Sequence, residues 1–126
     1  MMKKFVLLLT FMLLSPLSVF ALTAGEAVVT TKISDRMPVD KVEVYPAQTG
    51  KLYCFTRIEG AADETKVEHV WLYQGREMAR IGLPVRSNSW RTYSSKNIMP
   101  EWKGEWQVQI LDASGTEIAS VPFKVE

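Results

Sequence analysis

The chain carries the stretch VEHVWLYQGREMARIGL at residues 67–83, and this stretch decides the fold. Two runs rich in β-branched, aromatic and aliphatic residues flank Gln74-Gly75. Such a pair suits a two-residue hairpin turn of the primed type, because glycine tolerates a positive φ. The stretch therefore predicts an antiparallel hairpin with strands at Val67–Tyr73 and Glu77–Leu83. The region after residue 21 shows no helical periodicity that would argue for a different class of fold.

The turn also fixes a register for this hairpin. With Gln74-Gly75 as the loop, Tyr73 opposes Arg76 and His69 opposes Arg80. Side chains alternate between the two faces of a strand, so the aliphatic side chains fall together on one face, which we expect to be the core face. That face holds Val70, Leu72, Ala79, Ile81 and Leu83. The opposite face holds His69, Trp71, Tyr73, Met78 and Arg80, and this assignment depends on the position of the turn.

Short alternating or apolar runs recur about every ten residues through the rest of the chain, with turn residues between them. We expect strands near Ala27–Ile33, Lys41–Tyr45, Lys51–Glu59, Trp90–Ser94, Glu105–Leu111 and Ile118–Val125. Together with the hairpin, they predict an all-β protein, an antiparallel Ig-like β-sandwich of about seven to eight strands. The sandwich would form a single domain over residues 22–126, preceded by a signal peptide.

The expected strand Lys51–Glu59 has two different faces. Leu52, Cys54, Thr56 and Ile58 form one set, and Cys54 is expected to be buried there as a small hydrophobic residue. Tyr53, Phe55 and Arg57 form the other set. This second set repeats the mixture of aromatic and basic groups expected on the hairpin.

The first 21 residues have the features of a secretory signal peptide. Lys3 and Lys4 form a basic start, the stretch from Phe5 to Leu14 is uncharged, and Val19-Phe20-Ala21 suits a cleavage site. The apolar run is too short for a permanent transmembrane helix. We therefore expect a periplasmic or secreted protein, with no stable membrane span after cleavage.

The charge of the chain does not favour nucleic acid as a partner. The chain has 15 basic and 14 acidic residues, and loss of Lys3 and Lys4 leaves a net charge of about −1. Residues 76–103 are an exception, with six basic and two acidic groups. This segment forms either part of an ordinary mixed surface or a patch that meets an anionic partner.

Catalytic and metal-binding patterns are weak in this sequence. One cysteine and one histidine are too few for a zinc site, and no cofactor is expected. A serine hydrolase would have to combine Ser94, His69 and Asp112, but the Gly-x-Ser-x-Gly motif of a nucleophile elbow is missing. We therefore expect a protein that is not an enzyme and keep a small serine hydrolase as the weakest alternative.

Three segments resemble the bacterial family called domain of unknown function 2914. They are His69-Val70-Trp71 followed by Gly75-Arg76-Glu77, then Trp90-Arg91-Thr92-Tyr93-Ser94-Ser95-Lys96, and finally Trp102-Lys103-Gly104-Glu105-Trp106 with Val108. The resemblance extends from about Val39 to Val125. It implies a small β-domain found in exported proteins, and it implies no activity and no site residues.

Four tryptophans, Trp71, Trp90, Trp102 and Trp106, lie close together in the sequence. Trp106 alternates with polar residues and belongs to the core. The others either pack over one another, with Arg80 or Arg91 stacked between them, or form an exposed platform that binds a partner. The candidate binding residues are His69, Trp71, Tyr73, Arg80, Trp90 and Arg91.

These observations predict a non-catalytic binding module of the bacterial cell envelope. Its partner would be an envelope protein, bound through the aromatic and basic face or an open sheet edge. The alternative is a domain that binds a glycan or peptidoglycan through Trp71 and Trp90.

Overall fold

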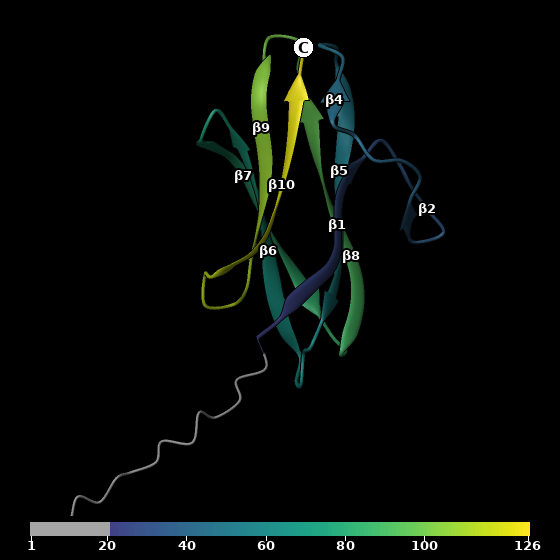
Figure 1. Cartoon of the computed structure of the whole chain (residues 1–126), viewed down its shortest axis with the longest axis vertical. Coiled ribbons are helices and arrows are strands. Elements are labelled where there is room, and N and C mark those ends of the chain that lie inside the picture. Colours follow the sequence, from purple (N-terminus) through teal and green to yellow (C-terminus); the bar gives the residue numbers. More distant parts are fainter. Residues whose placement is uncertain (1–20) are drawn as a thin grey trace, which may run out of the picture.

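The strands of this protein form two facing sheets, and the computed structural model describes residues 21–126 (Figure 1). A three-stranded sheet has the order β1-β5-β8, and a five-stranded sheet has the order β4-β10-β9-β6-β7. The first comprises β1 (Thr23–Thr30), β5 (Gly50–Glu59) and β8 (Ser89–Ile98). The second comprises β4 (Val44–Tyr45), β6 (Thr65–Tyr73), β7 (Arg76–Val85), β9 (Gly104–Leu111) and β10 (Glu117–Val125).

The predicted all-β sandwich is confirmed. The predicted signal peptide lies, apart from Ala21, outside the described residues. No helix within residues 21–126 is long and apolar enough to cross a membrane.

A small hairpin after β1 was not predicted. It consists of β2 (Ile33–Ser34) and β3 (Met37–Pro38), and its turn residues Asp35 and Arg36 both have a positive φ. Asp35 is a residue type that tolerates a positive φ, but Arg36 is not, so the sequence carries only a weak signal for this turn. The predicted strand Ala27–Ile33 correspondingly begins earlier and ends earlier, as β1.

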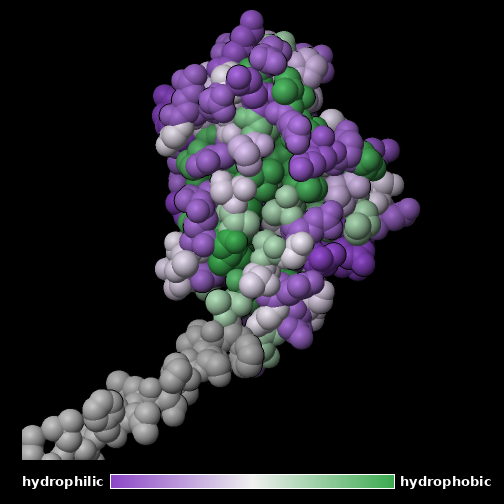
Figure 2. Space-filling view, viewed as in Figure 1, coloured by the Kyte–Doolittle hydropathy of each residue, from purple (hydrophilic) through white to green (hydrophobic). Residues whose placement is uncertain are grey.

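The core lies between the two sheets and is rich in aromatic residues. Trp71, Trp106 and Phe123 are buried there, with the Trp106 and Phe123 rings stacked at 5.7 Å. β1 and β10 are not hydrogen-bonded to each other, so the sandwich is not closed along this side. Figure 2 shows a band of hydrophobic residues between hydrophilic flanks on the face that carries these two strands.

The register of the β6–β7 hairpin differs from the prediction. Tyr73 does oppose Arg76, but a bulge after that point places Trp71 opposite Ala79 and His69 opposite Ile81. The extra residue lies on β7, so Ala79 and Ile81 share a face with Trp71 and His69 and not with Val70 and Leu72. That shared face is the core face, so the prediction that His69 and Trp71 lie on the outer face is wrong.

Burial agrees with the corrected register. Trp71 belongs to the core, with Tyr73 and Met78 packed against it, whereas Arg80 is exposed. Val70 and Leu72 lie on the outer face, contrary to the prediction. Val70 is nevertheless almost fully buried, opposite Arg80 and Gln109. Ala79, Ile81 and Leu83 pack against the core as predicted.

Candidate functional site

A buried polar cluster joins the two sheets. His69 on β6 contacts the Ser94 hydroxyl through Nδ1 at 2.7 Å and the Thr56 hydroxyl through Nε2 at 3.1 Å. The Trp71 indole N–H also donates to Ser94 Oγ, at 3.0 Å. Ser94 and Thr56 come from β8 and β5, so these bonds cross the interior of the sandwich.

Burial determines the charge state of this cluster. It lowers the pKa of His69 from 6.5 to about 4, because a charged imidazole loses its hydration there. At neutral pH the ring is uncharged and carries one N–H donor and one nitrogen acceptor. Two hydroxyl groups can satisfy such a ring, since each can donate or accept.

The same cluster bears on the serine hydrolase alternative. Ser94 and His69 do come together, but Asp112 does not join them. The Asp112 carboxylate accepts hydrogen bonds from Ser114 and Thr116 in its own turn, and these bonds lower its pKa, with Ser114 as the largest contributor. Ser94 is only 4% exposed and His69 is fully buried. A substrate carbonyl cannot reach the hydroxyl without opening the sandwich, so this geometry suits a structural link.

The other predicted site residues do not form one surface with the cluster. The Tyr73 hydroxyl donates to the Lys103 carbonyl at 2.6 Å, and its ring lies 5.0 Å from that of Trp106. Arg80 lies on the outer face and pairs with Glu77 at 2.7 Å and Glu68 at 3.3 Å.

The tryptophans have structural contacts. Trp90 and Trp102 are half-buried and pack against the core cluster that contains Trp71. The Trp71 ring meets Phe123 edge to face at 6.1 Å. The cation over a tryptophan is Lys96, 4.8 Å from the Trp102 ring, and neither Arg80 nor Arg91 takes that place.

The outer face of the β1-β5-β8 sheet carries an exposed group of aromatic and basic residues. Tyr93 on β8 is 49% exposed and meets half-buried Tyr53 edge to face at 6.1 Å. Arg57 on β5 lies opposite exposed Arg91 on β8. Phe55 shares their alternation but is fully buried. The aromatic and basic mixture expected on the Lys51–Glu59 strand is thus found on this face.

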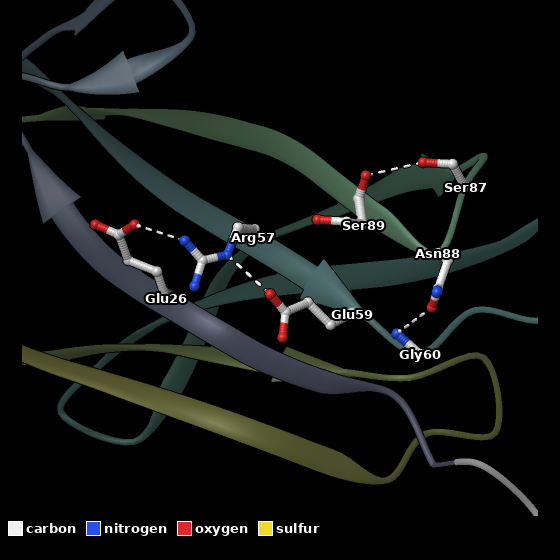
Figure 3. Close-up of polar contacts among 7 residues, drawn as sticks. All are labelled: Glu26, Arg57, Glu59, Gly60, Ser87, Asn88 and Ser89. Atoms are coloured by element: carbon white, nitrogen blue, oxygen red, sulfur yellow. Dashed lines mark hydrogen bonds and ion pairs between the residues drawn. The ribbon is translucent and has the colours of Figure 1, made fainter.

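The two arginines on this face have different surroundings. Arg57 pairs with Glu59 at 3.1 Å and with Glu26 at 3.8 Å (Figure 3). Arg91 makes no ion pair within residues 21–126. Like charges directly opposite each other in a sheet are unfavourable, and the two glutamates offset this only beside Arg57. Arg91 is therefore available to an anionic group.

Of the predicted residues, Arg91 belongs to this face, and sequence reasoning missed Tyr93. A signal was present, because Arg91 and Tyr93 alternate with Trp90 and Thr92 and must share one side of the strand. The sequence predicts that Tyr53, Phe55 and Arg57 on β5 share a face, but it does not show that β8 is the strand that pairs with β5.

Comparison with known proteins tests the family resemblance. A model described as "Protein of unknown function (DUF2914)" matches residues 64–125. The chain belongs to the DUF2914 family through these residues. The match includes β6 to β10 and is shorter than the predicted Val39–Val125. Arg91, Tyr93 and His69 lie inside it, whereas Tyr53, Thr56 and Arg57 precede it. No curated protein matches the chain.

Proposed function

We propose that this DUF2914 protein is an exported, non-catalytic binding domain of the bacterial cell envelope. Its binding surface would be the outer face of the β1-β5-β8 sheet. The observation that carries the proposal is the exposure of Tyr93 beside Arg91, which has no ion-pair partner within residues 21–126. Tyrosine and arginine, together with tryptophan, are the residue types that contribute most often to binding energy at protein interfaces.

A protein partner is the first candidate. The tyrosine rings offer rigid apolar area, and their hydroxyl groups can form hydrogen bonds at the edge of a contact. Arg91 can add a bidentate contact to a carboxylate. The buried His69 and Trp71 would support this surface from inside the sandwich and would not touch the partner.

A glycan is the second candidate, and the Tyr53–Tyr93 pair favours it. Aromatic rings can stack on a sugar, and Arg91 could bind an acidic group on it. The predicted platform of Trp71 and Trp90 is unsuited to this role, because Trp71 is fully buried and Trp90 packs against the core. A glycan would therefore stack on Tyr53 and Tyr93, and not on Trp71 and Trp90.

The proposal can be tested with two probes, soluble peptidoglycan fragments and an envelope extract. Tyr93→Ala and Arg91→Ala should each weaken binding by about 2 kcal/mol, or roughly 30-fold, with little change in melting temperature. Arg76→Ala is the matched control, since Arg76 is an exposed arginine on the other sheet. Equal losses in all three variants would contradict the proposal. Loss of extract binding alone would identify a protein partner.

The hydrolase alternative has its own test. A fluorophosphonate probe should leave the native protein unlabelled, because Ser94 Oγ is enclosed and accepts the Trp71 N–H. Labelling that disappears in Ser94→Ala would show that the site opens and would refute a non-catalytic domain.

A further inference from the structure

The outermost strands of the two sheets differ in how well they are protected from pairing with another chain. β7 has a bulge near Met78 and a proline at position 84. β10 contains Pro122, and β4 pairs with its last two residues. β1 has an irregularity near Gly25. Charges, prolines and bulges are the usual devices that prevent strand addition.

β8 lacks two of these devices, a bulge and a proline, although it carries the charged residues Arg91 and Lys96. All ten of its residues pair with β5 without a bulge, and it contains no proline or glycine. Its other side has no strand partner within the described residues, because β8 is the last strand of its sheet. This free edge is therefore long, regular and open to pairing.

The direction of the backbone groups follows from hydrogen bonds around the start of β8, of which the bond between Ser87 and Ser89 is drawn in Figure 3. The Asn88 carbonyl accepts a hydrogen bond from the Gly60 N–H at 2.9 Å, so position 88 is directed toward the β5 side. The Ser89 carbonyl instead accepts from the Ser87 hydroxyl at 2.8 Å. Alternation then directs the N–H and C=O groups of Arg91, Tyr93 and Ser95 away from β5. The Asn97 carbonyl agrees, because it accepts from the Lys96 ammonium group at 3.2 Å.

The side chains along this edge favour a particular partner. Arg91 already faces Arg57 on β5, so an acidic residue opposite Arg91 on an added strand would relieve the repulsion between the two arginines. Tyr93 is exposed two positions further along and would pack against an apolar or aromatic neighbour. Antiparallel pairing is expected, because both existing pairings in this sheet are antiparallel.

We infer that the free edge of β8 binds an extended segment of a partner protein by strand addition. Read from its N-terminus, the segment places a polar residue opposite Ser95, an apolar residue opposite Tyr93 and an acidic residue opposite Arg91. This inference rests on the proposed function, since it names the partner of the same surface. The inference adds backbone hydrogen bonds between the segment and β8 to the side-chain contacts of the proposed surface.

The test uses a blocked nine-residue peptide with threonine, valine and glutamate at the three alternate positions and serine between them. Binding should slow amide hydrogen exchange of Arg91, Tyr93 and Ser95 at least tenfold. A peptide with lysine in place of the glutamate should bind at least tenfold more weakly. Unchanged exchange at these amides at saturation, or no binding at millimolar peptide, would overturn the inference.

Two variants of Ser95 distinguish binding at the free edge of β8 from binding at the outer face of the sheet. Ser95→Pro removes the outward N–H and leaves the bonds to β5 intact, so it should fold and lose peptide binding at least tenfold. Ser95→Ala keeps the N–H and should bind normally. Peptide binding that survives Ser95→Pro but is lost in Arg91→Ala would overturn strand addition while leaving the proposed face in place.

A second copy of this chain is the competing occupant. In that case the three amides would become protected without peptide as the protein concentration rises. That result would overturn a peptide partner. Failure of the proposed function is distinguished separately, by envelope binding that is insensitive to both Tyr93→Ala and Arg91→Ala.

Discussion

His69 shows how a single residue can be polar in sequence and structural in role. Its ring is uncharged, fully buried and held between two hydroxyl groups. We predict that this makes the stability of the protein sensitive to mild acid. Well above pH 6.5 the histidine is neutral in both the folded and the unfolded chain. As the pH falls from 6.5 toward 4, the unfolded chain binds a proton that the folded chain excludes.

The free energy of unfolding should therefore decrease across this window, by up to about 3 kcal/mol. Urea denaturation at a series of pH values measures the effect. His69→Gln, which cannot titrate there, should give a flatter profile between pH 6.5 and 4. An unchanged slope in that variant would assign the effect to other groups.

Cys54 gives a second prediction at the scale of the residue. The thiol is fully buried in the core, and burial raises its pKa far above the ordinary range. A thiol reagent should label the native protein at least 100-fold more slowly than the urea-unfolded protein. Fast labelling of the native chain would show that β5 presents its other face to the core.

At the scale of the element, the sequence predicted the β6–β7 hairpin and its turn but not its faces. The two-residue loop is present, with Gln74 and Gly75 both at positive φ. The bulge beside Met78 contains neither glycine nor proline, so the sequence carries no signal for it. Alternation along β6 itself holds, because His69, Trp71 and Tyr73 share one face, but the bulge on β7 makes that face the core face. On β5, which pairs with β8 without a bulge, the predicted outer set is correct except that Phe55 is fully buried.

The link between the sheets provides a prediction at this scale. Ser94→Ala leaves the Trp71 indole and His69 without a shared buried partner, so it should lower the free energy of unfolding by about 1–3 kcal/mol. Trp71→Ala should cost about 3–5 kcal/mol, as expected for a buried aromatic residue. Thermal and urea denaturation measure both. Thr92→Ala, on the same side of β8, is the control and should have a smaller effect.

At the scale of the whole molecule, the proposal depends on export as well as on the binding face. The basic start and apolar run of residues 1–21 predict cleavage after Ala21. Mass spectrometry of the protein recovered from the periplasm or the medium should find an N-terminus at or near Leu22. Mature protein that keeps Met1 would contradict the predicted location.

The central claim is that the partner contacts the outer face of the β1-β5-β8 sheet. The most direct measurement is photo-cross-linking in the living cell, with a benzophenone amino acid placed at position 93 or at position 80. Both positions are exposed, but they lie on the outer faces of different sheets. We predict a discrete cross-linked product from position 93 and none from position 80. The opposite pattern would contradict the account.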